Sequence, residues 1–239
     1  MTAPLLKVEH LQVRYGDLIG VADVSLEVPE GSVVALLGTN GAGKTTTLNA
    51  IAGLIPVASG TVHFRDEQIA GKPAYAIVRK GLALSPEGWR LFVRQSVENN
   101  LLLGATTVAQ KHTVANMLER VYTLFPKLAQ RRKQLAGTMS GGERQMLAVG
   151  RALMSEPKML LLDEPSLGLA PAIVESMYET FGELHRTGLT LLLAEQSVEL
   201  ALEVSDYAYV LQVGRSIFSG PSATLANDPE IQRAYLGLR

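Results

Sequence analysis

Nine consecutive residues, with three glycines, one lysine and three threonines among them, have the composition of a phosphate-binding loop. They run in the order Gly38, Thr39, Asn40, Gly41, Ala42, Gly43, Lys44, Thr45, Thr46. Glycines let the backbone curl until successive N–H groups point at phosphate oxygens, and a helix N-terminus adds partial positive charge. Because the spacing fits G-x-x-x-x-G-K-[ST], we expect Lys44 to reach the β- and γ-phosphates of a nucleotide and Thr45 to offer its hydroxyl to Mg²⁺.

The flanks of this loop favour a phosphate site over a chance glycine turn. Residues 32–37 are an apolar, partly β-branched run typical of a buried parallel strand. Residues 45–52 are compatible with a helix. Strand, loop and helix in this order are the context that the phosphate-binding pattern requires.

Two adjacent carboxylates, Asp163 and Glu164, end an apolar run that begins at Met159. In a parallel α/β sheet, the end of such a strand lies at the same edge as a phosphate loop. Asp163 could hold Mg²⁺ directly or through water, and Glu164 could polarise an attacking water as a general base. A solvated turn is the alternative, and the phosphate loop, which needs such a partner, weighs against it.

Two further segments are weaker signals for a nucleotide. Ser140, Gly141 and Gly142 precede a predicted helix over residues 144–155, and a hydroxyl with unhindered N–H groups suits an anion. An ordinary N-cap is the alternative. Tyr15, at the exit of the first predicted strand, could stack on an adenine ring or could simply cap the core.

The periodicity predicts an antiparallel opening followed by an α/β core with a helical insertion at about residues 85–132. Predicted strands cover residues 6–13, 21–28, 32–37, 61–64, 81–85, 159–163, 190–194, 207–212 and 215–219, the last two as a hairpin. Predicted helices cover residues 45–52, 73–80, 108–125, 144–155, 171–186, 222–226 and 229–235, and Ser96 is the predicted N-cap of another. Pro126 is expected to stop the helix before it, and residues 131–133 to be a solvated helix end.

Composition narrows the class of protein. The 239 residues carry a net charge of −1, which gives no electrostatic case for binding nucleic acid. No cysteine is present, so disulfides, thiol catalysis and cysteine-metal sites are excluded. The mean hydropathy of +0.16 fits parallel strands buried on both faces. No window reaches the roughly 18 apolar residues that span a bilayer, so we expect a soluble cytoplasmic protein.

Taken together, these motifs resemble the ATP-binding cassettes of ABC transporters over essentially the whole chain. The Ser-Gly-Gly-Glu sequence at residues 140–143, upstream of Leu-Leu-Leu-Asp-Glu at residues 160–164, narrows the resemblance. It implies an α/β phosphate-loop NTPase fold, with a single ATPase domain over residues 1–239. The expected parts are a RecA-like core, an antiparallel β subdomain and a helical subdomain at about residues 88–140.

The same resemblance implies roles for individual residues. Ser140, Gly141 and Gly142 would serve the ATP held by a second cassette, so that each nucleotide lies between two subunits. Tyr15 would stack on adenine, and Glu164 would be the general base. The loop at residues 166–170 would cross the interface between the two cassettes.

Two positions depart from the pattern of most cassettes. Glu87 stands where a glutamine is usual, and Gln196 stands where a switch histidine is usual. The Glu87 carboxylate could still ligate Mg²⁺, including through water. Gln196 could hydrogen-bond the γ-phosphate but could not carry a proton or a positive charge. Both departures put the rate of hydrolysis in question.

The departures also sharpen the resemblance. With segments 85–92, 166–171, 194–197 and 234–237, they are similar to the second ATPase subunit of branched-chain amino acid importers. That likeness implies ATP and Mg²⁺ as ligands, and a second ATPase subunit, two membrane permease subunits and, indirectly, a solute-binding protein as partners. It also implies a peripheral location at the cytoplasmic face of the membrane. Hydrophobic amino acid specificity is only implied, because the solute never touches this subunit.

Other functions remain open from the sequence. A cassette for another solute, such as an amide, urea or a different amino acid, would share these motifs. A soluble cassette of DNA repair or translation usually needs a long coiled-coil insertion or tandem cassettes, and neither is present. A nucleotide-binding regulator without useful catalysis fits Glu87 and Gln196 but not Glu164. We expect residues 87–94 to receive a membrane subunit, unless Trp89 and Phe92 pack inside the helical insertion instead.

Overall fold

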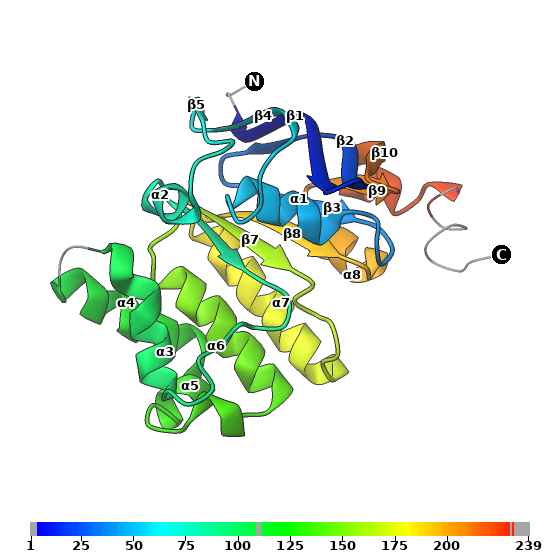
Figure 1. The fold of residues 1–239 in the computed structure, drawn as a ribbon. Coiled ribbons are helices and arrows are strands. Elements are labelled where there is room, and N and C mark those ends of the chain that lie inside the picture. Colours follow the sequence, from blue (N-terminus) through cyan, green and yellow to red (C-terminus); the bar gives the residue numbers. More distant parts are fainter. Residues whose placement is uncertain (1–3, 109–110, 230, 232–239) are drawn as a thin grey trace.

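The computed structural model describes residues 4–108, 111–229 and 231. In this part of the chain ten strands form one sheet in the order β5-β4-β1-β2-β10-β9-β3-β8-β7-β6. Figure 1 shows the antiparallel strands at one end of the molecule and the helices α3 to α6 at the other. The parallel strands lie between them, where both parts can contribute side chains to a site.

The antiparallel half is built from strands whose side chains alternate between buried and exposed positions. It consists of β1 (Pro4–Tyr15), β2 (Leu18–Pro29), β4 (Ser59–Phe64) and the short β5 (Glu67–Gln68). Next to it, β9 (Tyr207–Gln212) and β10 (Arg215–Pro221) form the predicted hairpin. A parallel bridge between Arg215 and Asp23 connects the two parts into one sheet.

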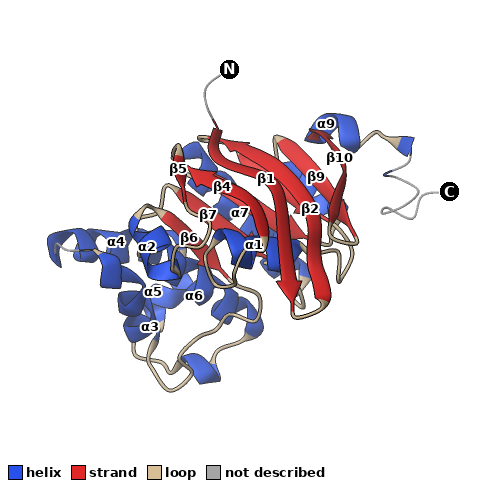
Figure 2. Ribbon diagram, turned by 45° about the horizontal axis from the view of Figure 1, so that its top comes forward, coloured by secondary structure: helices blue, strands red, loops and turns tan. Residues whose placement is uncertain are grey.

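The parallel half consists of β3 (Val33–Leu37), β8 (Thr190–Glu195), β7 (Met159–Asp163) and β6 (Leu82–Ser85). Its register pairs Leu37 with Glu195 and Asp163 with Ala194. The carboxyl ends of these strands therefore meet at one edge of the sheet, as Figure 2 allows the reader to follow. The phosphate loop follows β3 at this edge, and the predicted carboxylates end β7 there.

Successive residues of each parallel strand point into two different hydrophobic cores. On β3, Val33, Ala35 and Leu37 pack in the core formed with the helical part of the chain. Val34 and Leu36 pack in the core formed with α1 and the antiparallel strands. Because the strands are covered on both faces, their sequences are continuously apolar and not alternating.

The helices cover the sheet in two groups. On the side of the antiparallel strands lie α1 (Lys44–Ile51) and α2 (Ala74–Arg79). The other group comprises α3 (Val97–Gly104), α4 (Lys111–Leu124), α5 (Pro126–Gln130), α6 (Gly141–Leu153), α7 (Pro171–Arg186) and α8 (Val198–Val204). Short 3-10 turns lie at Ala105–Thr107 and Ala136–Thr138, and α9 (Ser222–Leu225) follows the hairpin. Ser96 is the N-cap predicted for α3, because its Oγ accepts from the Asn99 N–H at 3.1 Å.

Several local predictions need correction. Pro126 ends α4 but also begins α5, since a proline fits the first turn of a helix. Residues 131–133, by contrast, form a largely exposed turn directly after α5, as predicted, and Arg131 also pairs with Glu143 at 3.0 Å. The helix α8 and the strand β5 were not predicted. Most of the helix predicted over residues 229–235 lies outside the described residues. No helix in the described ranges is long and apolar enough to cross a bilayer.

Candidate nucleotide site

The phosphate loop is held in place by its own backbone and by the β9–β10 turn. The N–H of Gly214 donates to the carbonyl of Ala42 at 2.9 Å, and the N–H of Thr47 donates to the carbonyl of Gly43 at 2.9 Å. Gly43 has a φ of 104°, and a Cβ there would lie 3.1 Å from the carbonyl oxygen of Gly20. A glycine is therefore required just before α1 begins.

Lys44 uses the three donors of its ammonium group on three oxygens. Nζ lies 2.6 Å from the carbonyl of Gly38, 3.1 Å from the carbonyl of Thr39 and 2.9 Å from Oε1 of Glu164. The Lys44 and Glu164 side chains are only 4% and 6% exposed. The fold thus places the loop lysine and the second strand-end carboxylate in direct contact, although 119 residues separate them in the sequence. Glu164 itself has a left-handed backbone, with φ of 47°.

Thr45 and Asp163, two of the three predicted magnesium ligands, also meet. The Thr45 hydroxyl donates to Oδ1 of Asp163 at 3.0 Å. Burial raises the pKa of Asp163 from 3.8 to about 6; the charges of Glu87 and Glu164 also raise it, and the Thr45 hydrogen bond opposes the rise. A cation placed among these oxygens would offset the negative charge that raises this pKa.

The donor set fits Mg²⁺, which prefers a few oxygen ligands from the protein together with substrate phosphates. Thr45, Asp163 and Glu87 are all oxygen donors. In the described part of the chain, no group of three or more histidine, cysteine or acidic side chains could hold a metal ion. Thr45, Asp163 and Glu87 would hold the ion together with nucleotide phosphates.

Two neighbouring cavities share Thr45 and Glu87. One, of about 390 Å³, is lined by the phosphate loop, by Glu87 and Glu164, and by Leu167. The other, of about 720 Å³, is lined by Asp163, Thr45 and Glu87 and by the apolar side chains of Leu54 and Ile55. The structure therefore brings together most of the predicted site: the loop, both strand-end carboxylates and Glu87.

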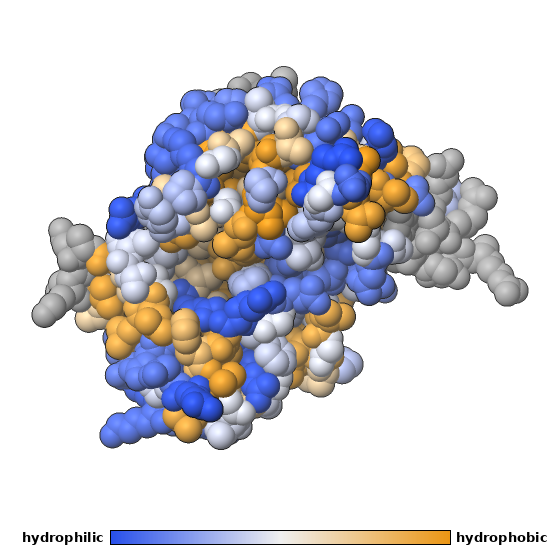
Figure 3. Space-filling model, viewed as in Figure 1, coloured by the Kyte–Doolittle hydropathy of each residue, from blue (hydrophilic) through white to orange (hydrophobic). Residues whose placement is uncertain are grey.

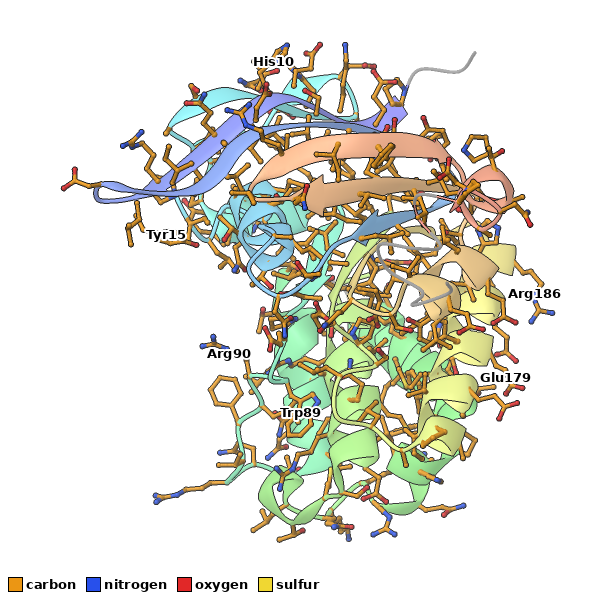
Figure 4. All side chains as sticks on the ribbon, turned by 90° about the vertical axis from the view of Figure 1, so that its right-hand side faces the viewer. His10, Tyr15, Trp89, Arg90, Glu179 and Arg186 are labelled. Atoms are coloured by element: carbon orange, nitrogen blue, oxygen red, sulfur yellow. The ribbon has the colours of Figure 1, made fainter. Side chains whose placement is uncertain are left out.

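Tyr15 lies beside the cavity of about 390 Å³ without lining it. Its side chain is 50% exposed, and its hydroxyl is 3.4 Å from Oγ1 of Thr46. A Cβ on Gly20 would come within 2.8 Å of the Tyr15 ring, so the ring lies directly over a residue that lines the cavity. Figure 4 shows Tyr15 and Arg90 on the same side of the molecule, Tyr15 near the antiparallel strands and Arg90 on the helical part.

The segment after Glu87 is strained and is clamped to α6. Trp89 and Arg90 follow Gly88 in left-handed conformations, with φ of 63° and 48°, and each costs about 1–3 kcal/mol. Arg151 of α6 donates to the carbonyls of Arg90 at 2.8 Å and Trp89 at 2.9 Å. The Arg144 guanidinium lies 5.4 Å from the centre of the Trp89 ring. Trp89 thus packs on the helical part, whereas Phe92 is 56% exposed.

Ser140, Gly141 and Gly142 lie apart from the two cavities and line neither. Ser140 is the exposed N-cap of α6 in a reciprocal capping box: its Oγ accepts from the Glu143 N–H at 3.4 Å, and Oε2 of Glu143 accepts from the Ser140 N–H at 2.9 Å. A Cβ on Gly142 would lie 2.6 Å from the Ile173 side chain of α7. The N-cap alternative is therefore present, and it leaves an exposed helix N-terminus.

Gln196 is also outside both cavities, with an exposed side chain. Sequence reasoning missed its neighbour Glu195, which is fully buried at the end of β8. Burial raises the pKa of Glu195. The available signal was an acidic residue that ends the buried run Thr-Leu-Leu-Leu-Ala-Glu, because carboxylates are almost never fully buried without partners.

A phosphate loop between a parallel strand and a helix, with a buried Asp-Glu pair beside it, defines a phosphate-loop nucleoside triphosphatase. Comparison with known proteins narrows this class. Residues 21–167 match the family model described as "ABC transporter", and the chain belongs to this family. It is accordingly an ATP-hydrolysing cassette, as the sequence predicted.

Relatives match the chain over nearly its full length. BraG of Pseudomonas aeruginosa, a high-affinity branched-chain amino acid transport ATP-binding protein, is 46% identical, with 98% of this chain and 100% of BraG covered. A probable branched-chain amino acid transport ATP-binding protein of Archaeoglobus fulgidus, LivF, is 36% identical, with coverage of 98% and 99%. A nucleotide-free ATP-binding cassette from an ABC transporter superposes with a TM-score of 0.85 at 26% identity, covering 98% of this chain and 100% of that chain. The predicted cassette fold is therefore confirmed.

Proposed function

We propose that this chain is the ATP-hydrolysing subunit of an importer for branched-chain or other hydrophobic amino acids. The observation that carries the proposal is the near full-length match to BraG at 46% identity, combined with a complete set of nucleotide-binding groups at one sheet edge. The whole chain acts as one ATPase domain, in which the helical part at about residues 88–140 moves relative to the RecA-like core.

Each part of the site takes a separate role in hydrolysis. Backbone N–H groups of residues 38–46 bind the phosphates, Lys44 neutralises their charge, and Tyr15 stacks on adenine. Glu164 accepts the proton of the attacking water, and Gln196 hydrogen-bonds the γ-phosphate. Since Lys44 and Glu164 are 2.9 Å apart, the phosphates displace Glu164 from the lysine when they bind.

Mg²⁺ belongs to this proposal as the ion that neutralises charge on the phosphates during transfer. Thr45 and Asp163 would hold it, and Glu87 would contact it directly or through water. The support is the 3.0 Å contact between Thr45 and Asp163 and the presence of Glu87 in both cavities.

The exposed N-terminus of α6 serves a second cassette. Ser140, Gly141 and Gly142 contact the γ-phosphate bound by the partner, and residues 166–170 cross the interface. A heterodimer is favoured because Pseudomonas aeruginosa has two such ATP-binding proteins, BraG and BraF, which are 46% and 32% identical to this chain. Two permease subunits and a solute-binding protein complete the transporter, and the cassette works at the cytoplasmic face of the membrane.

The permease docks on the segment that follows Glu87. Four apolar side chains near it are exposed by 40–56%: Phe92, Val93, Leu102 and Leu103. Figure 3 shows hydrophobic surface over the helical part of the molecule as well as over the part that contains the sheet. Arg90→Glu and Arg94→Glu, which place the opposite charge beside this patch, should weaken assembly with the membrane subunits and lower transport. Unchanged assembly and transport would exclude this docking site.

The function is tested by ATP hydrolysis of the complex purified from native membranes. Turnover should rise when the solute-binding protein is added together with leucine, isoleucine or valine. Stimulation only by another solute, such as an amide or urea, would keep the motor function and overturn the amino acid assignment. Recovery of the chain without any membrane subunit would overturn the transport function and favour a soluble cassette.

A further inference from the structure

Glu195 connects three elements through one buried carboxylate. Oε1 accepts from the backbone N–H of Ser166 at 3.0 Å and from the Tyr178 hydroxyl at 2.9 Å. Oε2 lies 3.2 Å from the backbone N–H of Gln196, which donates to it. The side chain is fully buried. Ser166 follows β7, Tyr178 belongs to α7 and Gln196 follows β8, so a single group joins the ends of two strands and a helix.

The two loops held by this carboxylate are those to which the proposed function gives separate tasks. Ser166 begins the loop expected to cross the cassette interface, and Gln196 is the residue expected to contact the γ-phosphate. A second contact links them, because the N–H of Glu164 donates to the carbonyl of Ala194 at 2.9 Å. The general base, the interface loop and Gln196 are therefore neighbours on one hydrogen-bonded network.

We propose that Glu195 is a positioning residue that makes the interface loop and Gln196 move as one unit during ATP hydrolysis. The inference rests on the proposed roles of residues 166–170 and Gln196. Two backbone donors share the carboxylate, so neither loop can leave its place without losing a charge-assisted hydrogen bond in a water-excluded environment. When the cassette interface closes on residues 166–170, the same carboxylate would consequently also bring Gln196 toward the γ-phosphate. If Glu195 served only to hold α7 in place, its hydrogen bond with Tyr178 would be sufficient.

Glu195→Gln separates these possibilities, because glutamine keeps the volume but has one acceptor oxygen where glutamate has two. One of the two backbone N–H groups then faces an amide donor and loses its partner. Tyr178→Phe is the matched control, because it removes the third donor and leaves both loop contacts intact. Both variants remove one buried hydrogen bond and should lower the thermal midpoint to a similar extent.

Measured in the purified transporter complex, Glu195→Gln should lower kcat for ATP by about tenfold and change KM by less than about twofold. Amide hydrogen exchange should become faster in peptides that contain Ser166 or Gln196. Tyr178→Phe should keep kcat within about twofold of the unmodified complex, with slow exchange in both loops. If Glu195→Gln does not assemble, Glu195→Asp, which withdraws the carboxylate by one methylene, should give the same pattern.

Wild-type kcat and exchange in the Glu195 variant would overturn the proposal. It would also be overturned if Tyr178→Phe reproduced the loss of kcat, since the carboxylate would then act only through α7. Solute-stimulated uptake is measured in the same preparations as a separate readout. Absence of uptake in the unmodified complex, with the variants still differing in kcat, would contradict the importer function and leave the role of Glu195 intact.

Discussion

The phosphate loop and the N-terminus of α6 both have the backbone geometry that suits an anion, but they differ in burial and in the partners of their polar side chains. Lys44 and Glu164 are buried and paired to each other, and Thr45 is hydrogen-bonded to Asp163. Ser140 is exposed, and its Oγ accepts from the Glu143 N–H of its own helix turn. The first region has its charged partners within the chain, whereas the second faces outward.

The difference matches the division of roles in the ATP site that we propose two cassettes share. In the proposed function, the loop half supplies the N–H donors, Lys44 and the carboxylates of one ATP site from a single chain. The α6 half has a capped, preorganised helix end, whose first-turn carboxylate, Glu143, pairs with Arg131 of the same chain. In the proposed function, this helix end acts on the phosphate that another chain brings to it. Variants in the two halves should consequently fail in different ways.

The largest effect is expected from Glu164→Gln, which removes the general base. Turnover should fall by about a thousandfold, while ATP affinity is retained, since the phosphate contacts of Lys44 remain. Steady-state hydrolysis and equilibrium binding, measured on the same complex, check both parts. Turnover near the wild-type rate would show that another group accepts the proton and would remove Glu164 from the chemistry.

Lys44→Ala should act on binding instead. Loss of two charge-assisted contacts, at about 1.5–3 kcal/mol each, should weaken ATP binding by about a hundredfold or more. Lys158 is an exposed lysine just before β7, and Lys158→Ala is the control for a general loss of positive charge. A titration with a fluorescent ATP analogue measures the change. Equal affinities for the Lys44 variant and the wild type would contradict the assigned role of the lysine.

Asp163 should make the nucleotide-free protein sensitive to pH. Its folded-state pKa, about 6, lies above the ordinary 3.8, so its contribution to stability is fully present below about pH 4 and is lost as the pH rises through about 6. Asp163→Asn removes this dependence. The variant should therefore gain stability relative to the wild type between pH 4.5 and pH 7.5, by about 2 kcal/mol or a factor of about 30.

The free energies of unfolding of the wild type and of Asp163→Asn are measured with urea at these two pH values, without Mg²⁺ or nucleotide. The same titration predicts that Mg²⁺-dependent ATP binding by the wild type weakens as the pH falls below about 6, because the ligand oxygen must be deprotonated. A difference in stability between the two proteins that stays constant with pH would contradict a raised pKa at Asp163.

The smallest effect is expected in the exposed half. Ser140→Ala removes the cap of α6 and a hydroxyl for the partner's nucleotide, and should lower turnover of the complex by about tenfold while leaving this chain's own ATP affinity unchanged. Ser96→Ala is the matched control, because Ser96 caps α3 through the same kind of bond. Each loses about 1 kcal/mol of helix stability. Equal turnover of the two variants would show that Ser140 acts only as the N-cap of α6.

How far the sequence predicts the molecule depends on the range of the interactions involved. The phosphate loop, the strand that precedes it and the carboxylates that end β7 follow from local patterns, and the structure places them together. The contact between Lys44 and Glu164 does not follow, since β3 and β7, which these residues follow, are distant in the sequence and lie on either side of β8 in the sheet. Burial of both charges is a tertiary property.

Glu195 and α8 show the same limit. The resemblance to known cassettes drew attention to Gln196, whose side chain is exposed, and away from the buried carboxylate beside it. Periodicity over the seven residues of α8 is too short to separate a helix from a loop. The strain at Trp89 and Arg90 is likewise invisible in the sequence, because it is sustained by Arg151 of α6.

The central claim, that each half of this chain serves a different nucleotide, is tested most directly by counting ATP molecules retained per transporter complex. Hydrolysis is slowed by Glu164→Gln and by the matching substitution in the partner cassette. We expect two retained nucleotides, one after adding Lys44→Ala, one after adding Ser140→Arg, and none when both are added to this chain. Retention by that last complex equal to retention with Lys44→Ala alone would contradict the claim, since α6 would then contribute nothing to the partner's site.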